Sequence, residues 1–246
     1  MIVKDIMTTR LVTVKADDTL SHAANLLRQY QFHHLPVVRS VKKPGAPVSE
    51  YFERNMLHLL EGLLTSQDID LAAALAKQAS SSASLRQPWQ EKRVGEVMHR
   101  ATMRVTPTTN VAAAAQILVE RGLNCLPVVE YENLGDETQT VLVGLLTRSD
   151  LLMALARSMG AFEPGMQITI ALPLGDLTPL AKTLLLAKEL HVQVRSIMAA
   201  PMEGNIPQDA TLRLGTINPS PLLVRLQEAN IAYSYADPLM EGHSHV

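Results

Sequence analysis

Two nearly identical heptapeptides contain the residues in this chain that are best suited to chemistry. GLLTSQD occupies residues 62–68 and GLLTRSD occupies residues 144–150, so Thr-x-x-Asp occurs twice in the same setting. At the start of a helix, this spacing forms a capping box: the Thr side chain bonds to a backbone N–H, and the acid three residues later bonds back to the first residue. One interpretation of both motifs is therefore a helix start that is used only for its geometry.

The same residue types also suit a phosphorylated nucleoside. The N-terminus of a helix offers unpaired N–H groups and positive potential, which attract a phosphate. A Thr hydroxyl can bond to a phosphate oxygen, and a carboxylate can accept hydrogen bonds from both hydroxyls of a ribose. The motif is thus compatible with an adenosine mono-, di- or triphosphate as well as with a simple cap.

A larger repeat surrounds the two heptapeptides. HHLPVV at 33–38 corresponds to NCLPVV at 124–129, and VKDIMTTRLVTV at 3–14 corresponds to VGEVMHRATMRVTP at 94–107. These segments are 91 residues apart, whereas the GLLT segments are 82 apart. The first copy therefore has nine additional residues between its LPVV and GLLT segments. They fall within SVKKPGAPVSEYFERN, whose Pro, Gly and Lys content is typical of an elongated hairpin or loop.

Each copy predicts the same series of elements. A short strand such as LVTV precedes an amphipathic helix, at 19–31 in the first copy and at 110–122 in the second. Thr19 and Asn110 are the expected N-caps of these helices. A strand on LPVV, a strand on LEGLL or LVGLL, and a helix from TSQD or TRSD follow. Two units of this size are expected to pack face to face about a pseudo-twofold axis.

The repeated run, DIM…VTV…HHLPVV…GLLTSQD and EVM…RVT…NCLPVV…GLLTRSD, resembles a tandem pair of CBS domains, the Bateman module. The resemblance covers about residues 1–160 and implies a first repeat at 1–78, a linker at 79–92 and a second repeat at 93–160. It further implies a regulatory ligand rather than a cofactor. That ligand would be an adenine nucleotide or another adenosyl compound such as S-adenosylmethionine, bound in the cleft between the repeats.

The resemblance also implies which residues would contact the ligand. Asp68 and Asp150 would bind ribose, and the phosphates would be contacted by Thr65, Gln67, Thr147 and Ser149. The Asp of each repeat would share a cleft with early segments of the other repeat. The partners expected for Asp150 are Met7, Thr8, His33 and His34, and those expected for Asp68 are Met98, Thr102, Leu123 and Asn124. Arg148 replaces the Ser66 of the first copy, which predicts that the Asp150 cleft prefers more phosphate charge.

After MGAFEPG at 159–165 the pattern changes. Strands at 166–172, 192–199, 210–217 and on IAYSYAD, with helices at 176–191 and 219–230, predict the order βαββαβ of a ferredoxin-like unit. LPLGDLTPLAKTLLLAKELHVQVRSI is similar to the opening half of an ACT domain, which implies an ACT-like domain at 166–237 and a tail at 238–246. Thr178 and Pro179 stand where the family places its ligand-binding glycine. Two roles of this domain therefore remain open: it binds an amino acid, or it serves only to dimerise the protein.

Composition argues against several classes of protein. Lys and Arg total 22 against 24 Asp and Glu, so there is no basic excess for nucleic acid or an anionic membrane. The single cysteine, Cys125, cannot form an intramolecular disulfide. The N-terminus lacks a signal-peptide h-region, and no run approaches the roughly 18 apolar residues of a membrane span. We therefore expect a soluble, cytoplasmic protein.

Catalytic and metal motifs are not found in the sequence. It contains no Gly-rich phosphate loop, no Cys/His cluster with metal spacing and no nucleophile elbow. His33 and His34 are adjacent, and neighbouring strand residues point to opposite faces, so we expect one to be packed and the other to face the cleft. A metal bound by His243 and His245 is less expected than a frayed tail.

The expected fold class is mixed α/β (α+β): a CBS pair followed by a βαββαβ domain, an architecture that resembles the acetoin utilisation protein family. We predict an allosteric ligand sensor that is not an enzyme and that acts on an unidentified target protein. Two modules of dimerising type predict a homodimer, with a tetramer as the alternative. Three other functions remain open: an amino-acid sensor, a structural dimerisation module with empty clefts, and a small enzyme acting on a nucleotide.

Overall fold

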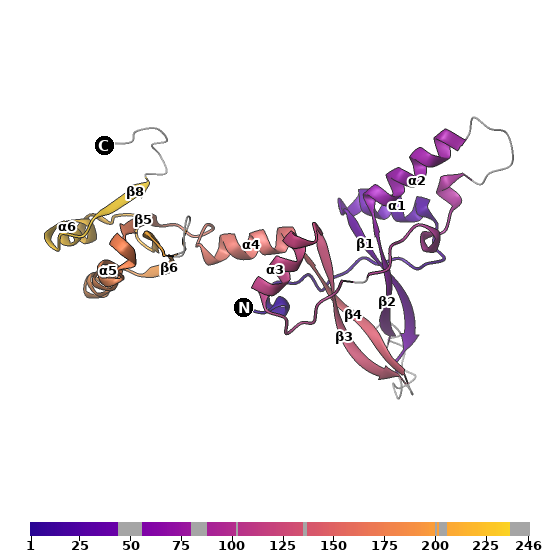
Figure 1. The fold of residues 1–246 in the computed structure, drawn as a ribbon, viewed down its shortest axis with the longest axis horizontal. Helices are drawn as coiled ribbons and strands as arrows, with labels where there is room; N and C mark the ends of the chain where they lie inside the picture. Colours follow the sequence, from indigo (N-terminus) through magenta and orange to yellow (C-terminus); the bar gives the residue numbers. More distant parts are fainter. Residues whose placement is uncertain are drawn as a thin grey trace. The chain divides into compact units, whose positions relative to one another are not determined.

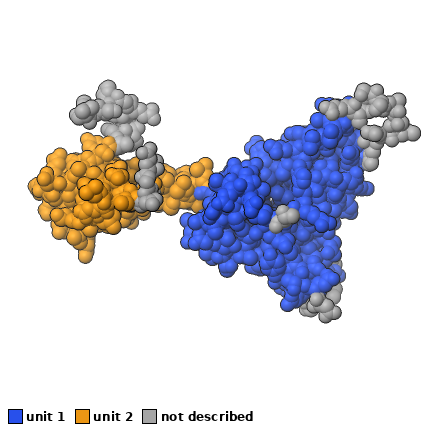
Figure 2. All heavy atoms as spheres, in the orientation of Figure 1, with its two compact units in different colours: residues 1–151 blue, residues 152–246 orange. Residues whose placement is uncertain are grey.

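The computed structural model describes residues 1–43, 56–79, 88–101, 103–134, 137–199, 201 and 206–236. The chain divides into two compact units, residues 1–151 and residues 152–246, which Figure 2 shows in different colours. Each unit contains a four-stranded sheet whose paired strands are antiparallel (Figure 1). The expected mixed α/β class is confirmed.

The first unit contains the same elements twice. The first copy consists of η1 (Val3–Asp5), α1 (Leu20–Tyr30), β1 (His34–Lys42), β2 (Met56–Thr65) and α2 (Ser66–Ala79). η3 (Trp89–Glu91) lies between the copies. The second copy consists of η4 (Val94–Glu96), α3 (Val111–Glu120), β3 (Cys125–Leu134), β4 (Glu137–Thr147) and α4 (Arg148–Ser158), and α4 continues past the boundary of the unit. Both predicted N-caps are confirmed: Thr19 accepts from the backbone N–H of His22, and Asn110 accepts from that of Ala112.

The two hairpins of this unit share a register. β1 pairs with β2 and β3 pairs with β4, and a register shift occurs at Val37/Val38 in the first and at Val128/Val129 in the second. Leu59 and Val141 join the hairpins into the order β1-β2-β4-β3. The nine additional residues of the first copy fall in the β1–β2 connection, of which residues 44–55 lie outside the described part.

The predicted strand on LVTV is wrong in extent. Only Val14 forms a bridge there, to Val37, and Val105 forms the equivalent bridge to Val128. A few residues before Val14, the chain pairs with the other repeat instead, where Thr8 forms a bridge to Leu145. A segment that changes partner within a few residues cannot form a continuous ladder with either sheet.

The opening segments of the repeats are exchanged. Val3 is fully buried in the core of the second repeat, with Leu118, Leu126 and others, and Val94 is fully buried in the core of the first. The backbone follows the same exchange, because Val3 N donates to Thr109 O at 2.9 Å and Val94 N donates to Asp18 O at 2.9 Å. Neither repeat completes its core alone, so the two repeats form one folding unit.

The second unit has the predicted element order. Its elements are β5 (Met166–Ala171), η5 (Pro173–Gly175), α5 (Thr178–Glu189), β6 (Val194–Met198), β7 (Asp209–Leu214), α6 (Ser220–Glu228) and β8 (Tyr233–Ala236). The sheet order is β6-β7-β5-β8. Ile168, Ile170 and Leu212 from one face of the sheet pack with α5 and α6 in a single core. Within the part of the chain that the structure describes, no helix is long and apolar enough to cross a membrane.

Candidate functional site

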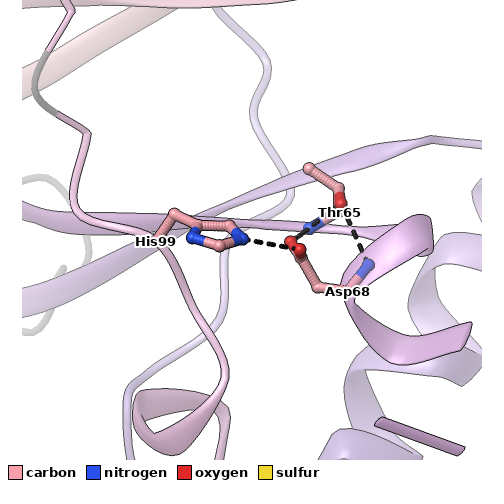
Figure 3. Close-up of polar contacts among 3 residues, drawn as sticks. All are labelled: Thr65, Asp68 and His99. Carbon is pink, nitrogen blue, oxygen red and sulfur yellow. Dashed lines mark hydrogen bonds and ion pairs between the residues drawn. The ribbon is translucent and has the colours of Figure 1, made fainter. Parts of the chain in front are cut away.

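Both Thr-x-x-Asp motifs form capping boxes. In the second, N and Oγ1 of Thr147 donate to Oδ2 of Asp150 at 2.8 and 2.7 Å, and Asp150 N donates to Thr147 Oγ1 at 3.1 Å. In the first, Thr65 and Asp68 make the same three bonds at 2.8, 2.8 and 3.2 Å (Figure 3). The capping interpretation is confirmed, and α2 and α4 begin directly after the Thr. The box leaves one carboxylate oxygen, Oδ1, of each Asp outside it.

Each box lies beside the opening segment of the other repeat. Thr8 and Leu145 exchange two backbone hydrogen bonds of 2.9 Å, and His99 and Leu63 exchange bonds of 2.8 and 2.9 Å. Met7 and Met98 lie against the glycines of the heptapeptides and pack on the hydrophobic cores, and neither lines the cavity described next. The two heptapeptides are therefore equivalent halves of one arrangement.

A cavity of about 470 Å³ lies between the repeats, beside the second box. Its volume falls in the range of roughly 300–1,000 Å³ that is usual for small-molecule sites. Its lining residues are Thr8, Arg10, Leu11, Val12, Gln31, Phe32, His33, His34, Pro36, Asn124, Leu145, Thr147, Arg148 and Ser149. The fold thus brings together seven predicted site residues: six that were expected at this cleft, Thr8, His33, His34, Thr147, Arg148 and Ser149, and one that was expected at the other, Asn124. Asp150 lies next to this cavity, with Oδ1 at 3.4 Å from the Thr8 hydroxyl.

Two arginines line the cavity, and they differ in what they bind. The guanidinium group of Arg148 donates from Nε to Leu123 O at 2.8 Å and from Nη2 to Leu118 O at 3.4 Å. These carbonyls lie in and after the last turn of α3, where a cation is favoured by the helix dipole. Arg10 is exposed, and among the described residues it makes no hydrogen bond or ion pair. Arg10, which sequence reasoning missed, is thus the cation in this cavity whose donors remain available.

The two histidines lie on the same cavity, so the expectation that only one would face it is wrong. Strand residues alternate between the two faces of a sheet, but only His34 belongs to a strand, because β1 begins at that residue. His33 lies in the segment before β1, which follows a left-handed residue, Gln31, with φ of 54°. Burial lowers the pKa of His34, the charge of His33 lowers it further, and the carboxylate of Asp68 opposes both. His34 is therefore uncharged at neutral pH and offers one donor and one acceptor to the cavity.

The first box has a different neighbour. Nε2 of His99 lies 2.7 Å from Oδ1 of Asp68. Figure 3 draws this contact as a dashed line between the two side chains. The His99 side chain is 74% exposed, whereas that of Asp68 is 11% exposed. Sequence reasoning missed His99, although the repeat contains the signal: His99 stands 91 residues after Thr8, which is the spacing of Met98 from Met7.

Two of the residues expected beside Asp68, Asn124 and Leu123, lie elsewhere. Asn124 lines the cavity beside Asp150, because its carbonyl accepts from the N–H of Arg148 at 3.1 Å and thus fixes it at the start of α4. Leu123 packs against the core of the second repeat, whereas Met98 lies against Gly62 of the heptapeptide that ends at Asp68 and packs on the core of the first repeat. Thr102 lies outside the described residues, and Gln67 is exposed and does not line the cavity beside Asp150.

A metal centre has no support in the described part of the chain, where no group of three or more His, Cys, Asp or Glu could hold an ion. The proposed tail histidines, His243 and His245, lie outside those residues.

Residues 3–45 and 94–157 of the chain match the family model of the CBS domain. The chain is 26% identical over 149 residues to the CBS domain-containing protein YhcV of Bacillus subtilis (strain 168), which covers 61% of this chain and 81% of YhcV. It is 27% identical over 156 residues to L-aspartate semialdehyde sulfurtransferase of Methanosarcina acetivorans, which covers 63% of this chain. The match spans only 24% of that enzyme.

Solved structures with a similar fold include CBSX2 in complex with AMP, at 24% identity and a TM-score of 0.42, covering 63% of this chain and 96% of CBSX2. They also include a candidate acetoin utilization protein (AcuB) from Vibrio cholerae, at 26% identity and a TM-score of 0.45. That match covers 67% of this chain and 98% of AcuB.

Proposed function

We propose that this protein, which carries a tandem pair of CBS domains, is a regulatory protein that binds an adenine nucleotide or another adenosyl compound beside Asp150. One observation carries the proposal: both repeats line a cavity of about 470 Å³ that lies next to a carboxylate oxygen outside its capping box. A helix cap alone would not need a cavity built from four separate segments of the chain.

The chemistry of the lining matches the parts of an adenosyl ligand. Leu11, Val12 and Phe32 provide apolar surface for a purine ring. Asp150 Oδ1 can accept hydrogen bonds from the ribose hydroxyls, since its present contact with Thr8 is 3.4 Å long. A phosphate would lie at the N-terminus of α4, near the hydroxyl of Ser149 and the guanidinium group of Arg10.

Regulation would follow from the position of the cavity. A ligand that touches segments of both repeats binds best to one arrangement of the two, and only such a difference in affinity between states makes binding allosteric. The receiver would be the C-terminal unit, a target protein or both. The helix that the Asp150 box caps, α4, continues past residue 151 into the chain of the second unit.

The assembly proposed for this regulator is a homodimer. Leu71 and Leu75 on α2 are 60% and 55% exposed, and an exposed apolar stripe of this kind favours burial against a second copy. Light scattering at working concentration tests this, and a monomer would contradict it. Replacing both leucines by Glu is expected to dissociate the dimer, whereas replacing the exposed Asp70 by Glu is not.

A second candidate is an amino-acid sensor in an ACT-like C-terminal domain, which the element order βαββαβ favours. The start of α5 is already occupied, because Oδ1 of Asp176 accepts from N and Oγ1 of Thr178 at 2.9 and 2.7 Å. These hydrogen bonds lower the pKa of Asp176, so it stays ionised at neutral pH. An amino-acid carboxylate would have to displace this side chain, which is why we rank the adenosyl ligand first.

Thermal unfolding with AMP, ADP, ATP, S-adenosylmethionine and common amino acids tests the proposal. Ligand at a hundredfold excess over Kd stabilises by about 2.7 kcal/mol. Each kcal/mol shifts Tm by roughly 2–4 °C for a chain of this size. A shift with an adenosyl compound is expected, and a shift with an amino acid alone would favour the second candidate.

A matched pair of variants locates the site. Asp150→Asn keeps an oxygen that can accept both Thr147 bonds, so the cap survives while the acceptor facing ribose becomes an NH₂ donor. Affinity is expected to fall at least tenfold in D150N and to stay unchanged in D70N, which alters an exposed Asp on α2. Full affinity in D150N would refute the site. Sustained turnover of the bound nucleotide would refute the absence of catalysis.

A further inference from the structure

The two boxes are equivalent in sequence but not in what surrounds their free oxygen. Oδ1 of Asp150 faces the hydroxyl of Thr8 at 3.4 Å, which is beyond the usual length of an O–H···O bond. Oδ1 of Asp68 faces Nε2 of His99 at 2.7 Å, which is the length of a bond to an ionised group. Thr8 and His99 occupy the same place in the repeat, 91 residues apart.

The short contact changes what Asp68 can accept. Its Oδ2 receives two bonds of 2.8 Å from Thr65, and its Oδ1 receives the imidazole N–H, so both oxygens are engaged. The Asp68 side chain is only 11% exposed, which limits the directions from which a further donor could approach. A ribose at Asp150 would displace one long contact, whereas a ribose at Asp68 would have to displace a short, charge-assisted bond.

The residue at the position of Arg10, which could bind a phosphate, also differs between the two clefts. Arg10, the cation with available donors in the cavity beside Asp150, corresponds to Ala101 in the second repeat. A cavity of about 360 Å³ does lie next to Ala101, but it is lined by Leu60, Glu61, Arg100, Ala101 and Arg104 and includes neither Thr65 nor Asp68. Within the described residues of the Asp68 side, both carboxylate oxygens are thus engaged and an alanine stands at the position of Arg10. The arginines nearby, Arg100 and Arg104, line a cavity that does not include the box.

We propose that His99 closes the Asp68 cleft to ribose-containing ligands, so that each chain binds one adenosyl ligand, at Asp150. This inference rests on the proposed function and adds the residue that decides which of two equivalent sites is used. His99 and Thr8 are its specificity-determining pair: a histidine at this position blocks the carboxylate, and a threonine leaves it open.

Isothermal titration with AMP and, separately, with S-adenosylmethionine tests the inference through the number of ligands bound per chain. The wild-type protein is expected to bind one. In His99→Thr, which copies the residue of the first repeat, a second site is expected. In Thr8→His, affinity at the Asp150 site is expected to fall at least tenfold. His58→Thr, which alters an exposed histidine on β2, is the matched control and is expected to bind one ligand as before.

The exchange of both residues gives the sharpest result. The double variant T8H/H99T is expected to bind one ligand at the opposite site, so that its binding is lost on adding Asp68→Asn and not on adding Asp150→Asn. Should H99T or the double variant fail to fold, D68N alone decides: it is expected to leave the affinity and number of ligands unchanged.

The outcomes separate this inference from the proposed function. Two equivalent sites in the wild-type protein, or one site in a folded H99T, would overturn the role of His99 while the adenosyl function stands. A lost site in D68N would do the same. Absence of binding by both probes to the wild-type protein would overturn the proposed function and this inference together.

Discussion

Gly62 lies directly under the backbone of His99: a Cβ atom on Gly62 would be 2.7 Å from the carbonyl oxygen of His99. The equivalent Gly144 would place a Cβ 2.6 Å from the sulfur of Met7 but 3.2 Å from the carbonyl oxygen of Thr8. In both places the opening segment of one repeat crosses the heptapeptide of the other. The glycine of the repeated motif thus permits a close approach between repeats, while its Thr and Asp cap the helix that follows.

Replacing the two glycines by alanine is expected to have unequal effects. In Gly62→Ala the new methyl group meets a backbone carbonyl held in a bridge to Leu63, and overpacking of this kind costs about 1–3 kcal/mol. In Gly144→Ala it meets mainly the end of the flexible Met7 side chain, which can move at lower cost. Urea denaturation measures both. A larger loss in G144A than in G62A would contradict the packing described.

Truncation of the exchanged valines is expected to destabilise both repeats at once. Val3→Ala and Val94→Ala each remove two buried methylene-sized groups and leave a cavity in the core of the other repeat, at a cost of about 2 kcal/mol. Lys4→Ala, which alters an exposed residue next to Val3, is the control and is expected to change stability by less than about 0.5 kcal/mol.

The measurement for these variants is denaturation followed by two probes, one for each repeat. Coincident transitions are expected, since neither repeat has a complete core without the other. Separate transitions in V3A, with the first repeat unfolding independently, would contradict a single folding unit.

Acid is expected to destabilise the protein through His34. Its pKa in the folded protein lies below the ordinary value of 6.5, so as the pH falls the unfolded chain takes up the proton first. The contribution of uncharged His34 to the free energy of unfolding is therefore fully present above pH 6.5, and it is lost as the pH falls toward the lowered pKa. In His34→Gln the decline in unfolding free energy across this range is expected to be smaller than in the wild-type protein.

Denaturation at a series of pH values between 7.5 and the lowest value at which the wild-type protein stays folded is the measurement, with the exposed His22→Gln as the control. An identical pH dependence in H34Q and the wild-type protein would rule out His34 as its source.

Cys125 is expected to be inert in the folded protein. Burial raises the pKa of Cys125 from 9.0 to about 12. The fraction of the thiol that is ionised to the reactive thiolate at pH 8 is therefore lower by about three orders of magnitude. Because Cys125 is the only cysteine, the labelling rate with a thiol reagent reports this one site. Labelling should be slow in buffer and fast in denaturant. Equal rates in both would show that β3 opens readily at its start.

Local features of the fold were predictable from the sequence. The caps at Thr19 and Asn110, the two capping boxes, and the α-helices and paired strands of both units follow from side-chain periodicity and from hydrogen bonds between residues at most three apart, whereas the strand expected on LVTV did not form. The resemblance to a CBS pair also implied that Thr8 would lie near Asp150, and the structure places these side chains 3.4 Å apart.

Only the tertiary structure decided what the free carboxylate oxygens face. The His99–Asp68 contact joins residues 31 apart and the Thr8–Asp150 contact joins residues 142 apart, and both depend on the exchange of opening segments between repeats. The cavity that contains Arg10 and Asn124 depends on the same exchange. Local propensity does not determine such contacts, because their geometry is set by how two complete cores pack together. The sequence therefore determined that there are two similar motifs, and packing decided that they are not alike.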